Sequence, residues 1–253
     1  MLILLPPSET KRDGGDGRAL DTALLRFPGL SSSRNELVSA LVALAADERA
    51  MVAALKLGPK QLAEVPRNRA AASSATMPVI DRYTGVLYDA LDVSGLSADA
   101  RAFAGGHVAV HSALLGPVGG LDLVPAYRLS HDSRVPGFVL KRHWAKPVAA
   151  ELAAVEGLLL DLRSEGYAAL GPLPQRNDAV YLRVVTEGDG GVRRALNHFN
   201  KQGKGRFTRA LLESGIDHPD VDSLLRWAAS TGWRLEVHAR TAEGRISELA
   251  LVV

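Results

Sequence analysis

The feature that most constrains the fold is the continuous apolar run Leu2–Leu5, which ends at Pro6 and Pro7. Consecutive apolar residues without polar alternation are typical of a strand buried on both faces of a sheet. The two prolines end the strand, because proline lacks a backbone donor and restricts the residue before it. The run therefore predicts a central strand of an α/β sheet.

A polar, glycine-rich loop follows at residues 8–18, SETKRDGGDGR. Loops at the carboxyl ends of central strands are where open α/β sheets usually bind ligands. The spacing of Gly14, Gly15 and Gly17 matches neither the dinucleotide-binding nor the P-loop motif. The loop is either a ligand loop of another kind or a mobile surface loop.

The remaining patterns alternate between helix and strand. Helices are predicted over 35–57 (capped by Ser32 or Ser33), 98–103 (capped by Ser97) and 144–156 (with Pro147 in its first turn), and strands over 107–115, 158–164, 179–185 and, as a closing hairpin, 233–239 with 246–253. No internal repeat or linker divides the chain. One mixed α/β domain over residues 1–253 is therefore expected.

The composition is that of an ordinary globular protein, with 47% hydrophobic and 23% charged residues and a net charge of +2. Nucleic-acid affinity would therefore have to come from a local patch. The chain has no cysteine, which excludes disulfides, thiolate metal sites and thiol peroxidase chemistry.

The apolar start is too short for a signal peptide or a membrane span, so a soluble cytoplasmic protein is expected.

The segment 192–209, VRRALNHFNKQGKGRFTR, is basic and contains no acidic residue. It leads into a helix that Gly215 can end in the left-handed conformation, and Asp217 is expected to cap the next helix, with Asp220 near its start. A charge run of this kind is either a solvated face or a contact to a phosphate backbone. Composition alone does not decide between the two.

Two further groups of side chains are candidates for a site. Tyr83, Thr84, Gly85 and Tyr88 form an aromatic and polar cluster that belongs either to the rim of a site or to a packed turn. Proline 125 disfavours a regular strand beyond it, which places Tyr127, Arg128 and His131 on an irregular segment of the kind that often carries function.

Several motifs, in order and in register, resemble the YaaA family, also called DUF328 or UPF0246. They are MLILLPPSETK at the start, YTG at 83–85, LDLVPAYRL at 121–129, HW at 143–144 and NKQGKGRFTR at 200–209. The likeness covers nearly the whole chain. Gly119-Gly120 and Leu115 depart from the family pattern and make that edge less basic and less aromatic.

The resemblance implies a single compact α/β domain with a mixed central sheet, flanking helices and a positively charged cleft. It also implies a role in protection from peroxide and in limiting free iron, without a cofactor, and non-specific binding of double-stranded DNA with a helix–hairpin–helix-like element. A monomer is the favoured state. The residues expected to bind nucleic acid are Lys11, Arg128, Lys201, Lys204, Arg206 and Arg209, and those expected to line the cleft are Ser8, Thr10, Tyr83, Thr84, Gly85 and Tyr127.

Two other functions stay open at this point. One is an enzyme acting on nucleic acid or a nucleotide-like anion, with Lys201 or Lys11 as the amine nucleophile and Asp122 or Asp89 as its carboxylate partner. The other is an iron-binding protein, which would need a cluster of histidines. The candidates for that cluster are His107, His111, His131 and His143. The DNA-binding hypothesis requires the loop 8–12 and the segment 201–209 to face one cleft.

Overall fold

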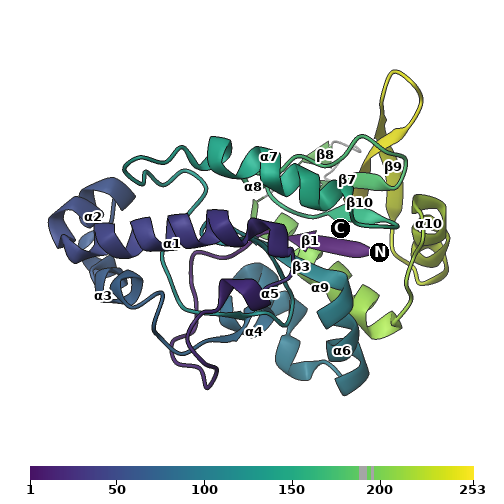
Figure 1. The fold of residues 1–253 in the computed structure, drawn as a ribbon. Coiled ribbons are helices and arrows are strands. Elements are labelled where there is room, and N and C mark those ends of the chain that lie inside the picture. The colour runs from purple at the N-terminus through teal and green to yellow at the C-terminus, as the bar shows by residue number, and fades with distance from the viewer. Residues whose placement is uncertain (188–192, 195–196) are drawn as a thin grey trace.

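A computed structural model describes residues 1–187, 193–194 and 197–253 of the chain. Its sheet has the strand order β4-β3-β1-β6-β7-β10-β9, with β8 paired to β7 (Figure 1). The strands of this sheet are β1 (Leu2–Leu5), β3 (Val108–Ser112), β4 (Gly116–Gly119), β6 (Leu159–Asp161), β7 (Ala179–Glu187), β8 (Arg193–Arg194), β9 (Leu235–Arg240) and β10 (Ile246–Val252). A short two-stranded sheet pairs β2 (Met77–Pro78) with β5 (Leu123–Val124).

The middle of the sheet is parallel. Strand β1 pairs in parallel with β3 on one side and with β6 on the other, and the parallel order continues through β7 to β10. The outer strands β4 and β9 run antiparallel to their neighbours. All four residues of β1 are buried, as the apolar run predicts for a strand covered on both faces.

Helices and short 3₁₀ turns connect and cover these strands. The helices are α1 (Ser31–Ala46), α2 (Glu48–Leu55), α3 (Glu64–Arg69), α4 (Val79–Arg82), α5 (Val86–Leu91), α6 (Ala98–His107), α7 (Leu140–Ala153), α8 (Glu165–Ala168), α9 (Asn197–Ser214) and α10 (Val221–Ser230). The 3₁₀ turns are η1 (Thr22–Leu24), η2 (Pro28–Leu30), η3 (Pro59–Gln61) and η4 (Val93–Gly95). Helices α2 and α3 lie at one end of the molecule, and α10 lies with the β9–β10 hairpin at the other (Figure 1).

The prediction of a mixed α/β domain is confirmed, and so are the closing hairpin of β9 with β10 and the cap of α6, where Ser97 accepts from the backbone of Ala100. The single helix predicted over 35–57 is wrong. It is broken at Asp47, whose side chain accepts from the Ala50 backbone and so starts α2. The predicted serine caps are also wrong, because Ser32 and Ser33 lie inside α1.

Two further predictions about helix ends need correction. Helix α7 begins at Leu140, so Pro147 lies inside the helix and not in its first turn. Asp220, not Asp217, caps α10, through a hydrogen bond from the backbone of Ser223. Asp217 instead pairs with the amino group of Met1. Gly215 does adopt the left-handed conformation at the end of α9, with φ of 61°.

Helix α9 contains the basic residues from 201 to 209 and packs against α5, α6 and β7. Phe207, Leu211 and Leu212 on this helix are buried in the core. Gly205 is required for the close approach, because a Cβ at this position would lie 2.2 Å from the carbonyl oxygen of Leu87 on α5. The basic residues therefore form part of a tightly packed helix and not a loose arm.

In the described parts of the chain, no helix is both long enough and apolar enough to span a membrane.

Candidate ligand-binding pocket

A pocket of about 770 Å³ lies at the carboxyl ends of β1 and β6. Its walls come from the loop after β1, the start of α5, the segment 130–132, the loop after β6, the middle of β7 and the first half of α9. This is the edge at which open α/β sheets commonly bind ligands. The pocket brings the loop residues Ser8, Glu9 and Thr10 together with Lys201 and Lys204 of α9.

Hydroxyl groups form one wall of the pocket. The Thr10 Oγ1 atom lies 2.9 Å from Thr84 Oγ1 and 3.2 Å from Ser8 Oγ. Gly85 follows with φ of 98°, a conformation that glycine adopts without strain. The wall therefore offers several hydrogen-bonding groups close together to a polar ligand.

Lys11 lies behind this wall and not in it. Its Nζ donates to the carbonyl oxygens of Ser8 and Glu9, at 3.0 and 3.3 Å, and lies 4.3 Å from the centroid of the Tyr127 ring. Burial lowers the pKa of Lys11 to about 7. The lysine side chain therefore holds the loop in place from beneath.

Tyr83 and Tyr127 are buried in the same layer. Their hydroxyl oxygens are 2.7 Å apart, and the Tyr127 hydroxyl lies 2.6 Å from Ser112 Oγ at the end of β3. Burial raises the pKa of Tyr127 to about 12, and the pKa of Tyr83 rises for the same reason. These two tyrosines, which the sequence placed in the cleft lining, support the pocket wall from below.

Lys204 enters the pocket from the opposite side. Its side chain is buried, and its Nζ lies 3.4 Å from the carbonyl oxygen of Arg163 and 5.6 Å from the centroid of the Tyr181 ring. The Tyr181 hydroxyl donates to the same carbonyl at 2.8 Å. Burial lowers the pKa of Lys204 to about 8, against the opposing charge of Asp161.

A buried ion pair holds that carbonyl in place. Arg163 donates to both carboxylate oxygens of Asp161, at 2.8 and 2.6 Å, and its Nη1 lies 2.6 Å from Nδ1 of His111. Burial and then the charge of Arg163 lower the pKa of His111, so its ring is neutral and Nδ1 accepts. The last residues of β6 and the loop after it are thereby fixed at the pocket floor.

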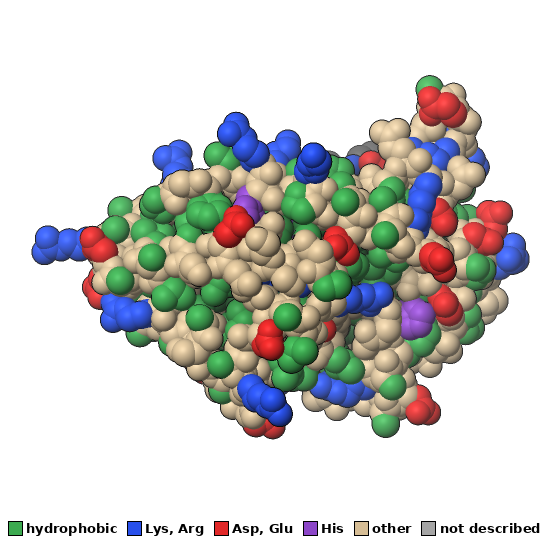
Figure 2. Space-filling model, viewed as in Figure 1, with side chains coloured by type: hydrophobic (Ala, Val, Ile, Leu, Met, Phe, Trp, Pro, Cys, Tyr) green, Lys and Arg blue, Asp and Glu red, His purple; other side chains and the backbone are tan. Residues whose placement is uncertain are grey.

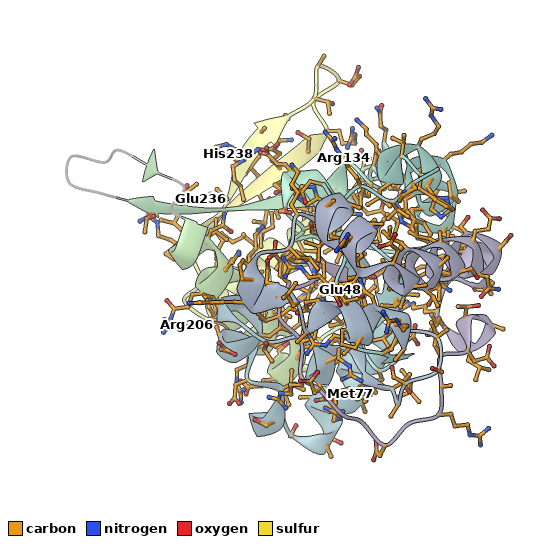
Figure 3. All side chains as sticks on the ribbon, turned by 90° about the vertical axis from the view of Figure 1, so that its left-hand side faces the viewer. Glu48, Met77, Arg134, Arg206, Glu236 and His238 are labelled. Carbon is orange, nitrogen blue, oxygen red and sulfur yellow. The ribbon has the colours of Figure 1, made fainter. Side chains whose placement is uncertain are left out.

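The other cations predicted to bind nucleic acid differ in how far they are already engaged. Arg128 pairs with Glu9 at 2.7 Å, and Arg209 donates to carbonyl oxygens of Leu91, Asp92 and Gly95. Lys201 and Arg206 are exposed, and no ion pair to either is seen within the described residues. Lys201 lies at the pocket, whereas Arg206 points outward from α9 (Figure 3).

The predicted carboxylate partners lie elsewhere. Asp122 accepts from the backbones of Arg26 and Gly119, at 2.8 and 2.7 Å, and burial raises its pKa. Asp89 is exposed and accepts from the backbone of Gly85 at 3.2 Å. Neither lines the pocket, and both hold backbone turns.

The four candidate histidines occupy separate environments. His107 Nδ1 lies 2.8 Å from the carbonyl oxygen of Met1, and His143 Nε2 lies 2.9 Å from that of Ser33. His111 is bound to Arg163, and His131 packs edge-on against Tyr167 at the pocket. Within the described residues, no three His, Cys, Asp or Glu side chains form a group that could hold a metal ion.

The basic segment is only partly described. Val192, Leu196 and the side chains of Arg193, Arg194, His198 and Phe199 lie outside the described residues.

On the face shown in Figure 2, acidic and basic side chains are interspersed.

A second cavity, of about 820 Å³, lies between the loop 175–178, the start of α10 and the turn of the β9–β10 hairpin. Its lining carries both signs of charge, including Asp178, Asp222, Arg240 and Arg245. It contains none of the residues that the sequence indicated as binding, cleft-lining or catalytic, so the pocket at the strand ends is the stronger candidate.

The pocket residues after β6 and on β7 were not predicted from the sequence. Ser164, Glu165, Gly166 and Tyr167 follow a buried strand in the same way as the loop after β1 does. The rule that directed attention to residues 8–12 also applies to LDLRSEGY. Tyr181 and Arg183 gave no such signal, because they are the half-exposed positions of an ordinary alternating strand.

The structure is that of an α/β protein with a pocket at the carboxyl ends of its parallel strands β1 and β6. The sequence profile described as "Peroxide stress protein YaaA" matches residues 1–238. The chain belongs to this family, also named UPF0246.

Curated relatives of the chain carry the same family name. A UPF0246 protein of Corynebacterium efficiens is 38% identical over an alignment of 258 residues. The alignment covers the whole of this chain and the whole of that protein. A UPF0246 protein of Streptomyces coelicolor is also 38% identical, over all of this chain and 98% of its own length. A more distant UPF0246 protein of Polynucleobacter asymbioticus is 29% identical over 56% of this chain and 58% of its own.

Proposed function

We propose that this member of the peroxide stress family binds nucleic acid non-specifically, with the pocket holding one phosphate-bearing unit. The observation that carries the proposal is that the loop Ser8–Thr10 and the segment Asn200–Lys204 of α9 face one pocket. A volume of about 770 Å³ is in the usual range for sites that take one small ligand. A duplex does not enter such a pocket, but a single nucleotide unit fits.

The charges of the pocket support an anionic ligand of this kind. Lys201 is exposed at the pocket, and Lys204 lies deeper. Arg206 lies five residues from Lys201, about 140° around the helix, and would contact a phosphate beyond the pocket. Binding of this kind would limit iron-driven oxidative damage to the nucleic acid by shielding it. Thiol-based removal of peroxide is excluded because the chain has no cysteine.

The internal contacts of the other cations limit the expected affinity. Lys11, Arg128 and Arg209 are engaged within the protein, and Lys204 is buried. Counterion release then comes from Lys201 and Arg206, so log K should fall with log salt with a slope of about −2, not the roughly −5 expected for six phosphate contacts. Of the six cations expected to bind nucleic acid, Lys201 and Arg206 are therefore the two that are free to contact phosphates within the described residues.

Fluorescence anisotropy with a short labelled duplex across a salt series tests the proposal. Wild type and Lys60→Ala should bind equally, because Lys60 is an exposed lysine on η3 that does not line the pocket. Lys201→Ala and Arg206→Ala should each weaken binding and reduce the slope by about 1. Absence of binding by wild type at low salt, or an unchanged slope in the double variant, would contradict it.

A further inference from the structure

We propose that Lys204 is an amine nucleophile that forms an imine with the aldehyde of a sugar phosphate. The sugar phosphate is either a free molecule or an abasic position in DNA. The inference rests on the pocket of the proposed function but does not require duplex binding. It assigns a catalytic residue and a substrate class to the site.

Access distinguishes Lys204 from the other two lysines near the pocket. Lys11 is enclosed behind the loop, where its amine is bound to two carbonyl oxygens and covered by Tyr127, and it does not line the pocket. Lys201 lines the pocket but is exposed to solvent, which keeps an ammonium group well hydrated. Lys204 is the one of the three that is both buried and open to the pocket.

The surroundings of Lys204 favour the neutral amine that such chemistry needs. Its Nζ has one long contact, 3.4 Å to the Arg163 carbonyl, and the Tyr181 hydroxyl already donates to that oxygen at 2.8 Å. The nearby carboxylate of Asp161 is bound on both oxygens by Arg163. No ion pair to Lys204 is seen among the described residues, and burial disfavours the charged ammonium, so the amine lone pair is available near neutral pH.

The rest of the pocket indicates what the carbonyl compound carries. The Thr10 hydroxyl lies 3.2 Å from that of Ser8 and 2.9 Å from that of Thr84 along the wall. Such a wall suits the hydroxyl groups of a sugar. Lys201 at the pocket suits a phosphate, to which lysine binds as a point charge. A sugar phosphate with an open-chain aldehyde has hydroxyl groups for this wall, a phosphate for Lys201 and a carbonyl group for Lys204.

The reaction is a condensation. The nitrogen of Lys204 adds to the carbonyl carbon as the C=O π bond breaks, and one amine proton moves to the oxygen, which gives a carbinolamine with a new C–N bond and a hydroxyl group. The nitrogen then gives up its second proton, the C–O bond breaks, and the oxygen leaves as water, so that a C=N bond remains. Water reverses the same steps and restores the free amine.

Borohydride trapping tests the assignment. Wild-type protein is mixed with 2-deoxyribose 5-phosphate, or with a duplex that contains one abasic position, and the imine is reduced to a stable secondary amine. Peptide mass mapping should place the adduct on Lys204. The trapping rate should increase up to about pH 8, the value to which burial lowers the pKa of Lys204.

The variants Lys204→Arg, which keeps the charge, and Lys204→Met, which keeps the shape, should lose trapping by at least about tenfold. Lys60→Arg, at an exposed position that does not line the pocket, should be trapped as wild type is. An adduct at Lys11, Lys201 or the amino terminus, or none with either aldehyde, would overturn the assignment.

Intact duplex bound by wild type without any trapping would overturn this inference alone, whereas trapping without duplex binding would overturn the proposed function alone. Trapping with the free sugar phosphate but not with the abasic duplex would identify a small-molecule substrate.

Discussion

The Lys11 ammonium group lies 4.3 Å from the centroid of the Tyr127 ring, inside the protein and beneath the loop that forms the pocket wall. The aromatic face and two backbone carbonyl oxygens replace the water around the cation. They replace it incompletely, because burial still lowers the pKa of Lys11 to about 7. The loop and its lysine therefore make the stability of the protein depend on pH.

Replacing Lys11 by methionine should flatten the dependence of stability on pH. The unfolded chain holds the lysine proton up to the ordinary pKa of 10.5, whereas the folded protein releases it near 7. Unfolding takes up a proton between these values, so the stability of wild type rises with pH by up to about 1.4 kcal/mol per unit. Urea unfolding at several pH values between about 7 and 9 should show this slope reduced in Lys11→Met.

Lys60→Met is the matched control, because Lys60 is exposed and its loss should leave the slope unchanged. Lys204, with its pKa lowered to about 8, contributes a slope of the same sign and should still do so in Lys11→Met. The same slope in Lys11→Met as in wild type would show that Lys11 stays charged in the folded protein.

Replacing only one residue of the Asp161–Arg163 ion pair should strongly destabilise the protein. Both side chains are buried, and Arg163→Met leaves the Asp161 carboxylate without its partner. The expected loss is about 3–5 kcal/mol in the free energy of unfolding, because an uncompensated buried charge is left. The double variant Asp161→Asn/Arg163→Met removes that charge and should recover part of the loss. Chemical denaturation of all three proteins measures it, and a double variant less stable than the single one would contradict this account.

Gly205→Ala should destabilise the protein although alanine is the better helix former. The added Cβ would lie 2.2 Å from the Leu87 carbonyl oxygen and 2.8 Å from the Ala90 side chain, so α9 and α5 must separate. The expected cost is about 1–3 kcal/mol. Gly106→Ala on α6 is the control, because its Cβ meets open space, and it should gain about 0.5–1 kcal/mol. Thermal melting of the two variants should show shifts of opposite sign.

Arg209→Ala should affect stability and not nucleic-acid binding. The Arg209 guanidinium donates to the carbonyl oxygens of Leu91, Asp92 and Gly95 and so closes the end of α5. Its removal should cost about 1–3 kcal/mol in stability and leave duplex affinity unchanged. Arg206→Ala on the same helix should show the reverse. Fluorescence anisotropy and thermal melting of both variants measure duplex affinity and stability. Weaker duplex binding by Arg209→Ala would show that Arg209 contributes to the binding surface.

Much of the architecture follows from local sequence. The run Leu2–Leu5 predicts a strand buried on both faces, and it forms β1 at the centre of the parallel strands. The alternation in 179–185 predicts β7, and the pattern around TAEGR predicts the closing hairpin. Helix boundaries were less accurate, because a side chain such as that of Asp47 can act as a cap only where the backbone turns.

The candidate site followed from sequence only in part. The position of the loop 8–10 at the end of a buried strand was enough to single it out. That this loop meets α9 at one pocket depends on the strand order, which brings β1, β6 and β7 side by side from distant parts of the chain. The loop after β6 carried the same local signal, but only that strand order makes it the floor of the same pocket.

The sequence by itself determined that this chain is an α/β protein of the YaaA family with a basic segment and helix after the strand predicted over 179–185. Only the tertiary structure decided what each basic residue on that helix does. Lys204, Arg206 and Arg209 are alike in sequence terms, yet the first is buried in the pocket, the second is exposed and the third closes the end of α5. The Lys204 contact to Arg163 spans 41 positions of the chain and the Arg209 contacts to backbone carbonyl oxygens span 114 to 118, so no local pattern contains them.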